Sequence, residues 1–241
     1  GAANITGLKL FIGRVNVTNE SGTSMTNAYM ATADNADAGI RYNDAGGNLT
    51  VESGMELHVF TGKQFAPGGS VTTTSESTSG NPGGDLHIAT SATLTMTSHA
   101  LSVGGDYLNE GTFSGGGAQI TTFTATGSGF TITPGTGNLR SVVFNGSGGT
   151  WTMSSGSLTI NETLTITAGN FNVNAANLTV TGNTSVSGTL TISSAGGTNQ
   201  FTGNVTINNG GTWNNSGNDN PTLSGNLQND GTFTAGSGNY V

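Results

Sequence analysis

The sequence predicts an all-β protein folded as a right-handed parallel β-solenoid, with about three short strands in each coil of roughly 20 residues. Three observations support this fold class. Triplets of apolar, polar and apolar residues recur along the chain, glycine and asparagine fill the gaps between them, and equivalent triplets return at a nearly constant interval. Sandwiches and barrels use strands of about five to ten residues, so segments this short favour a solenoid.

Each triplet alternates as a half-buried strand does. The flanking residues are Leu, Ile, Val or Phe, and the central residue is mostly Thr or Asn. Thr and Val in such positions also favour extended backbone. We therefore expect the flanking residues to fill a narrow core and the central residues to form outward ladders. Such triplets occupy residues 158–160, 164–166, 171–173, 178–180, 190–192 and 205–207.

The spacing of the triplets predicts the coil. Leu158 and Leu178 are 20 positions apart, with two further triplets between them. Gly and Asn in the gaps, as at 168–170 and 181–183, tolerate the backbone conformations that sharp corners need. At a strand spacing of about 4.8 Å, about ten such coils would give a rod on the order of 50 Å long.

A longer similarity links distant parts of the chain. Residues 105–116 and 225–236 are identical at six of twelve positions, at an offset of 120 residues. A shorter echo relates Gly-Thr-Trp at 149–151 to Gly-Thr-Trp at 211–213. These similarities predict that a long unit recurs. We expect the aromatic residues that follow Gly-Thr to pack in the core, because buried aromatic rings supply much apolar area.

The chain divides into three expected regions. Residues 1–70 contain four of the five basic residues and the longer apolar run 8–17, and they predict an N-terminal cap or small head. Such a cap is useful because solenoid ends expose unpaired strand edges. Residues 71–85, rich in Ser, Thr, Gly and Pro, predict a loop, and residues 86–241 predict the solenoid repeats.

Composition excludes several classes of protein. Cysteine is absent, so there is neither a disulfide scaffold nor a thiolate metal site. The formal net charge is -8, which argues against nucleic acid as a partner. No apolar run approaches the roughly 20 residues that a membrane span needs. The chain starts with Gly and shows no signal peptide, so we expect mature or excised material.

Three Thr-, Asn- and Gly-rich segments carry a family resemblance: Asn-Leu-Thr-Val-Thr-Gly-Asn at 177–183, Ser-Gly-Thr-Leu-Thr-Ile at 187–192, and Asn-Asp-Gly-Thr-Phe-Thr-Ala-Gly-Ser-Gly at 229–238. They resemble the β-strand repeats of large bacterial surface proteins and the passenger regions of filamentous-haemagglutinin-type adhesins and autotransporters. The resemblance covers roughly residues 86–241. It implies an elongated, extracellular protein that adheres or forms fibres, and it carries over no catalytic residue.

Candidate cofactor sites are few. Asp34, Asp37 and Asp44 form an oxygen-rich cluster of the kind that binds calcium, although an Asx-rich turn is the preferred interpretation. We expect no other cofactor. His58 and His87 each occupy the central position of an apolar triplet, so both should point outward. They could share a face, but a metal site needs a third ligand, and the sequence reveals none.

Two further surface chemistries depend on the coil register. Asp85, Asp106 and Glu110 would supply the clustered carboxylates of a polysaccharide lyase or hydrolase only if the register aligned them; scattered solubilising charge is the preferred interpretation. Recurring Thr-x-Thr, as at 131–133 and 179–181, is typical of ice-binding β-solenoids. These pairs do not return at one fixed interval, so strand propensity explains them as well.

The leading hypothesis is a non-enzymatic structural protein of the cell exterior or cell surface, a β-solenoid subunit or segment of a fibre, filament or adhesin. Its partners would be further copies of itself, joined head to tail or laterally, and surface glycans. An edge strand that completes a neighbour's sheet would join the copies. The alternatives are a carbohydrate-binding or polysaccharide-lyase-like β-helix and an ice-binding β-solenoid. The apolar residues expected to carry self-association are Leu8, Leu10, Ile12, Val15 and Val17.

Overall fold

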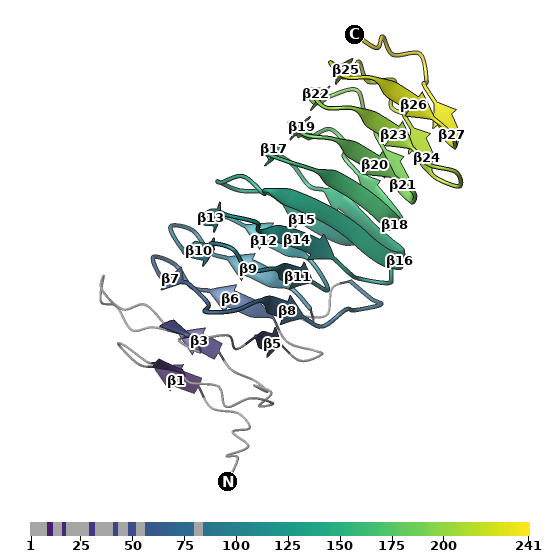
Figure 1. Ribbon diagram of the computed structural model, residues 1–241. Helices are drawn as coiled ribbons and strands as arrows, with labels where there is room; N and C mark the ends of the chain where they lie inside the picture. Colours follow the sequence, from purple (N-terminus) through teal and green to yellow (C-terminus); the bar gives the residue numbers. More distant parts are fainter. Residues whose placement is uncertain are drawn as a thin grey trace.

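A computed structural model shows a parallel β-solenoid of about 8 turns with roughly 21 residues per turn (Figure 1). It describes residues 9–11, 16–17, 29–31, 41–42, 48–51, 56–79 and 84–241, and only the backbone for the first four of these segments. Every strand pair in these residues is parallel, and none of them lies in a helix. The predicted fold class is confirmed. At a strand spacing of about 4.8 Å, eight turns make a rod about 40 Å long.

The turns build three faces, each a column of hydrogen-bonded strands. Face 1 forms the continuous path of the largest sheet. Its strands are β5 (Leu49–Val51), β8 (Val71–Thr73), β11 (Leu101–Val103), β14 (Ile120–Phe123), the first parts of β16 (Ser141–Met153) and β18 (Leu164–Asn172), β20 (Thr184–Val186), β23 (Val205–Ile207) and β26 (Leu227–Asn229).

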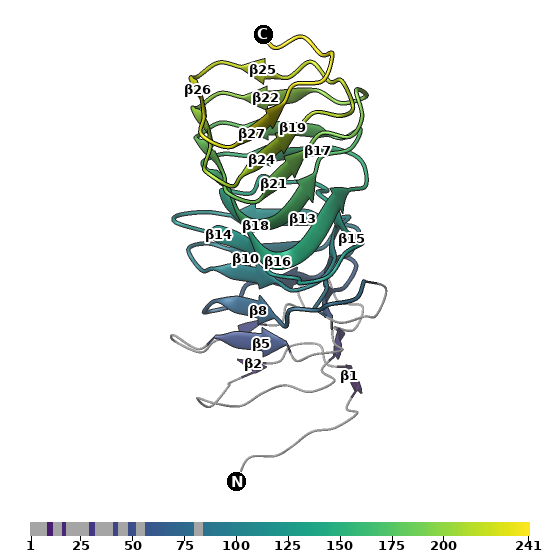
Figure 2. The ribbon, with the colours of Figure 1, turned by 90° about the vertical axis from the view of Figure 1, so that its right-hand side faces the viewer.

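Face 2 joins face 1 through β16 and β18, which are long enough to bend around the corner between the two faces. Figure 2 shows its later strands one above another. Its strands are β6 (Leu57–Val59), β9 (Leu86–Ile88), β12 (Tyr107–Asn109), β15 (Phe130–Thr133), the second parts of β16 and β18, β21 (Thr189–Thr191), β24 (Thr212–Asn214) and β27 (Thr232–Thr234).

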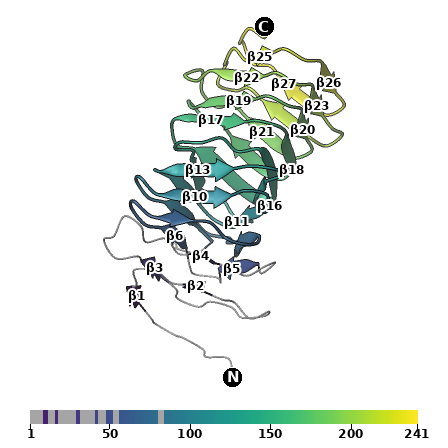
Figure 3. The ribbon, with the colours of Figure 1, turned by 60° about the vertical axis from the view of Figure 1, so that its left-hand side comes forward.

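Face 3 consists of two shorter sheets (Figure 3). Single bridges from Thr136 to Thr112 and from Leu139 to Ile160 connect them. The first sheet holds β7 (Gln64–Phe65), β10 (Thr93–Met96) and β13 (Thr112–Gly115), and the second holds β17 (Ser157–Ile160), β19 (Asn177–Val180), β22 (Asn199–Phe201) and β25 (Thr222–Leu223).

Two strand pairs precede these faces at the N-terminal end of the rod. β1 (Lys9–Phe11) pairs with β3 (Tyr29–Ala31), and β2 (Asn16–Val17) pairs with β4 (Arg41–Tyr42). In Figure 1, β1 is the outermost strand and β3 lies between it and the rest of the stack. Leu10 and Val17 of the predicted edge strand therefore belong to paired strands at this end, whereas Leu8, Ile12 and Val15 lie outside the described residues.

The alternation predicted from sequence is what builds the core. The first and third residues of most triplets are buried, and the central residue is partly exposed. Phe144 stacks between Phe123 and Phe171, with ring centroids 4.8 and 4.4 Å away. Trp151 and Trp213 are fully buried, as expected for aromatic residues that follow Gly-Thr. One continuous apolar column therefore runs through the rod.

The corners require glycine where successive turns touch. Gly182, Gly203 and Gly225 occupy the same corner on three successive turns, each followed by Asn. A Cβ added to Gly203 would lie 2.4 Å from the carbonyl carbon and oxygen of Gly182. Beside this contact, Asn204 N donates to Asn183 Oδ1 at 3.0 Å, and Asn226 N donates to Asn204 Oδ1 at 2.9 Å. Glycine allows the close approach, and asparagine ties the turns together.

The expected region boundaries need correction. Strands β5, β6 and β7 pair in register with later strands of the three faces, so the solenoid already includes residues assigned to the head. The loop expected over 71–85 begins with β8, whose Val71 is fully buried. The same segment does widen one turn: Val71 pairs with Leu101, 30 positions later, whereas Leu101 pairs with Thr121, 20 positions later.

The long repeat is a shared corner rather than a shared turn. Its first copy connects β12 of face 2 to β13 of face 3, but its second connects β26 of face 1 to β27 of face 2. Both corners have the same local structure, because Asn109 and Asn229 each accept a hydrogen bond from the glycine N–H two residues later. An offset of 120 residues is not a whole number of turns, so similar sequences lie on different faces.

Candidate functional site

Face 2 carries two distinct groups of polar side chains. Near the N-terminal end of the rod lie histidines and carboxylates, and further along lies an uncharged array of Thr and Asn. We call Glu56, His58, His87 and Glu110 the His–Glu cluster. Eight Asp and Glu side chains lie in the described residues. Five of them belong to this cluster or lie near it in sequence: Glu56, Glu76, Asp85, Asp106 and Glu110.

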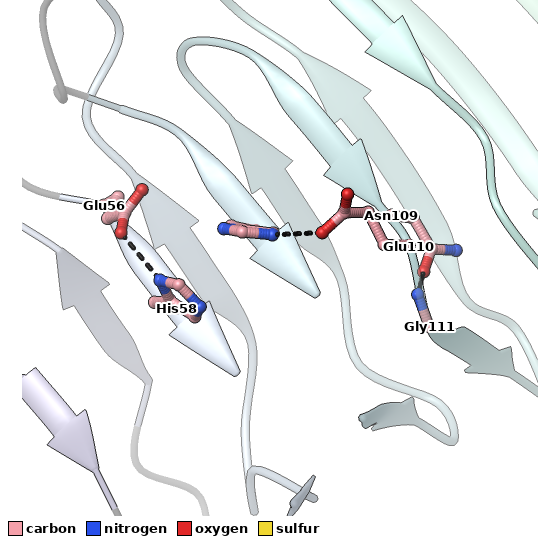
Figure 4. Close-up of polar contacts among 6 residues, drawn as sticks. Glu56, His58, Asn109, Glu110 and Gly111 are labelled. Atoms are coloured by element: carbon pink, nitrogen blue, oxygen red, sulfur yellow. Dashed lines mark hydrogen bonds and ion pairs between the residues drawn. The ribbon is translucent and has the colours of Figure 1, made fainter. Parts of the chain in front are cut away.

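Two histidines form the centre of the His–Glu cluster. His58 and His87 are the outward residues of β6 and β9 and face each other in register, with ring centroids 4.1 Å apart. His58 Nδ1 lies 2.9 Å from Glu56 Oε1, and His87 Nε2 lies 3.0 Å from Glu110 Oε2 (Figure 4). One ligand atom from each of Glu56, His58 and His87 lies within 4.8 Å of the others.

Local sequence explains this placement. In Leu57-His58-Val59 and Leu86-His87-Ile88 the apolar neighbours are buried, so strand alternation forces both imidazoles outward. Glu56 precedes His58 by two residues and therefore projects from the same side. Phe60 follows by the same rule and stacks on the His58 ring at 4.2 Å. The histidine rings are partly shielded, with 21% of each side chain exposed.

A line of carboxylates runs beside the cluster. The register places Glu56, Asp85 and Asp106 at equivalent positions on successive turns, each one residue before its strand. Burial and the neighbouring carboxylates raise the pKa of Asp85 to about 6, although a hydrogen bond from the Asp106 N–H at 2.7 Å opposes the shift. Asp106 itself accepts from the backbone and hydroxyl of Thr131. The register thus aligns Asp85 with Asp106, which the sequence alone left open.

The second group is a two-column array on the later turns of face 2. In most of these strands two residues that are at least partly exposed flank one buried apolar residue. Thr191 is itself buried and donates to Asn170 Oδ1 at 2.9 Å, and Phe233 in the last strand is only partly buried. The columns run roughly 4.8 Å per turn along the rod and are roughly 6.6 Å apart across it. Thr150, Asn170, Thr189, Thr212 and Thr232 form one column, and Thr152, Asn172, Thr191, Asn214 and Thr234 form the other. We call these ten residues the Thr/Asn array.

The array is built from other Thr-x-Thr pairs than those named from the sequence, because 131–133 belongs to β15 of face 2, on the turn before the array, and Thr179 belongs to β19 of face 3. Thr-x-Thr pairs do not return at a fixed interval along the chain, yet those at 150–152, 189–191 and 232–234 lie on the same columns. Corners of different length absorb the differences in spacing. The array therefore has the regularity that the sequence spacing did not show.

The C-terminal end of the rod presents open strand edges. Strands β26 and β27 pair only with the preceding turn. Leu227, whose equivalents Thr184 and Val205 are buried, is 39% exposed here, and Phe233 is only partly buried. The N–H groups of Thr184 and Val205 each donate to a carbonyl oxygen of the following turn. The N–H group of Leu227 occupies the same register position and would donate to a further turn in the same way. This end has the backbone groups and the apolar side chains to accept another turn.

The structure describes some of the predicted site residues and not others. The calcium candidate Asp34, Asp37 and Asp44 lies outside the described residues. The outward orientation of His58 and His87 is confirmed. Sequence reasoning missed Glu56 as the third potential ligand, although its i, i+2 spacing from His58 on a strand signals a shared face. Glu110 could not be found this way, because its contact with His87 depends on the register between turns.

Comparisons with family models, curated proteins and solved structures found no match to this chain. The residues and their geometry therefore carry the functional argument. A bilayer-spanning helix is also absent from the residues that the structure describes.

Proposed function

We propose that this chain is a non-enzymatic structural protein of the cell exterior, a β-solenoid subunit or segment of a surface fibre or adhesin. The observation that carries the proposal is the continuous parallel stack of turns, in which each turn of the described residues from β5 onward pairs with its neighbours and shares one apolar column with them. Unpaired edges that keep apolar residues exposed favour the addition of another strand layer. Composition supports the extracellular setting, because the chain lacks cysteine and is rich in Thr, Ser, Asn and Gly.

The sequence of the last turn supports continued stacking. Its corner at 229–233 matches the corner at 109–113, and on that internal corner a further turn is stacked: Phe113 N donates to Thr136 O at 2.9 Å. The proposed occupant of the C-terminal edge is a second copy of this chain. In that copy, β1 and β2 lie at the N-terminal end of the rod and pair in parallel with β3 and β4. The N-terminal end of one copy can therefore join the C-terminal end of another while all strands keep the same direction. Such a contact does not close and yields a filament.

Edge variants test this proposal. Leu227→Lys places a charge on the open edge, and Thr206→Lys places the same charge on the outward side of β23, one turn away from it. In sedimentation velocity at increasing concentration, we expect the wild-type protein and Thr206→Lys to polymerise and Leu227→Lys to remain largely monomeric. A wild-type protein that stays monomeric throughout, or equal polymerisation of both variants, would refute the proposal.

The Thr/Asn array favours a second candidate, ice binding. An ice-binding surface needs a rigid, uncharged lattice of regularly spaced hydroxyl and methyl groups. The array has ten positions and no charge, and buried residues such as Trp151, Phe171 and Trp213 fix its backbone from below. Thermal hysteresis measurements test whether the protein binds ice. Ice binding is supported if the wild-type protein shows thermal hysteresis that Thr212→Lys removes and that Thr165→Lys on face 1 leaves intact. A wild-type protein without thermal hysteresis excludes ice binding.

A further inference from the structure

We propose that Glu56, His58 and His87 form a binding site for a divalent transition-metal ion, with Zn²⁺ as the representative case, that links two successive turns of the rod. The inference is independent of the proposed function. It rests on the proximity of three side chains from two turns, whose potential ligand atoms lie within 4.8 Å of one another. The histidines face each other in register, so their rings are neighbours because of the fold itself.

One of the three distances already suits a bound metal ion, and the other two lie within 4.8 Å. Tetrahedral Zn²⁺ with bonds of about 2.0–2.1 Å separates its ligand atoms by about 3.4 Å. His58 Nδ1 and Glu56 Oε1 are already 2.9 Å apart, so a metal ion can replace the proton between them with a small widening. The three side chains are partly exposed and therefore have room to rotate toward a common metal ion.

Glu110 prepares His87 for coordination. Its carboxylate lies 3.0 Å from His87 Nε2 and favours the tautomer with a proton on that nitrogen. The lone pair of His87 Nδ1 is then available to a metal ion. A carboxylate behind a ligating imidazole is the usual arrangement in metal sites, where it orients the ring and raises its basicity. Glu110 is thus a positioning residue.

The surrounding charge favours a cation. Asp85 stands at the position equivalent to Glu56 on the next turn, and Asp106 follows one turn later. Like charges aligned at the spacing of adjacent strands repel each other, and a bound dication offsets that repulsion. Two imidazoles and one carboxylate suit Zn²⁺, Cu²⁺ or Ni²⁺, whereas Ca²⁺ and Mg²⁺ require oxygen ligands.

The site would close a long connection. His58 and His87 are 29 positions apart around the widened turn, whereas Leu86 and its partner Tyr107 are 21 apart. A metal ion that binds both histidines holds the two turns together in the folded state alone. Binding to the folded state raises the stability of this end of the rod by linkage.

Calorimetric titration of the tag-free full chain with Zn²⁺ provides the first test. The protein has three histidines, so His99, which is outside the cluster, serves as the matched control. We expect one Zn²⁺ per chain, at least about tenfold weaker binding in His58→Asn and His87→Asn, and unchanged binding in His99→Asn. Absence of 1:1 binding, or equal affinity in all three variants, would overturn the site.

A second measurement needs no variant and therefore holds even if a substitution disturbs folding. NMR of the wild-type imidazole groups during Zn²⁺ addition should shift the resonances of His58 and His87 and leave those of His99 in place. Before Zn²⁺ is added, His87 should carry its proton on Nε2, and Glu110→Gln should reduce that preference. Equal shifts at all three histidines would indicate non-specific binding and contradict the proposal.

Discussion

Replacing Gly203 by alanine should destabilise the rod, because the new Cβ would push two successive turns apart. The new Cβ would lie 2.4 Å from two backbone atoms of Gly182 and 2.8 Å from Asn183 N. Ordinary contacts between such atoms begin at about 3.5 Å, so the two turns must separate by about 1 Å at this corner. Both partners are backbone, so no side-chain rotation relieves the contact.

The cost follows from the hydrogen bonds at the same corner. Separation weakens Thr202 N to Val180 O at 2.9 Å, Thr184 N to Asn204 O at 2.8 Å, and Asn204 N to Asn183 Oδ1. Three bonds at about 1 kcal/mol each give about 3 kcal/mol. The reduced freedom of the unfolded chain returns up to about 1 kcal/mol. The expected net loss is about 2–3 kcal/mol in the free energy of unfolding.

Urea unfolding followed by tryptophan fluorescence measures this loss, because Trp151 and Trp213 are fully buried in the native rod. Gly196→Ala is the matched control. Gly196 is exposed, and its nearest neighbour for a new Cβ is the Ala175 Cβ at 3.2 Å. We expect the control to change stability by less than about 0.5 kcal/mol. Equal stability of the two variants would refute the argument that glycine sets the approach of successive turns.

Four further predictions concern the core and the N-terminal end. Phe144→Ala should cost about 3–5 kcal/mol in urea unfolding, because it removes the ring that stacks between Phe123 and Phe171; a loss below about 1 kcal/mol would contradict this packing. Tyr107→Phe should stabilise the protein by about 1 kcal/mol in the same assay, since the buried Tyr107 hydroxyl makes no hydrogen bond of normal geometry and interacts only weakly with Asn109; destabilisation would show that the contact with Asn109 is a stabilising bond. Burial also raises the pKa of Tyr107, so its ultraviolet absorbance should change only when alkali unfolds the rod, and Tyr107→Phe should lack that late component. Deletion of residues 1–17 should abolish polymerisation in sedimentation velocity, because it removes β1 and β2; unchanged polymers would exclude these strands as the joining edge.

The fold was predictable because each of its elements has a local cause. Alternation in triplets such as Leu178–Val180 fixes which side chains are buried, and Gly-Asn corners fix where the chain turns. Register was not predictable, because corners of different length shift equivalent residues by 19 to 30 positions between turns. For the same reason the similarity between 105–116 and 225–236 suggested a repeating unit, although the structure shows only a repeating corner.

The candidate sites likewise contain features that have a local cause and features that depend on the register between turns. Strand alternation is local, so it correctly placed His58 and His87 outside, and it would have placed Glu56 beside His58. The pairing of His87 with Glu110 and the columns of the Thr/Asn array depend on contacts between turns. Those contacts lie about 20 or more residues apart in sequence, beyond what spacing alone can determine.

Electron microscopy of the purified wild-type protein tests most directly whether the rod is the subunit of a fibre. The account predicts unbranched filaments in which strand layers continue at about 4.8 Å across subunit boundaries, with a subunit repeat set by the length of the rod. The open edge of Leu227–Asn229 would then be buried at each junction. Isolated short rods at every concentration would contradict it.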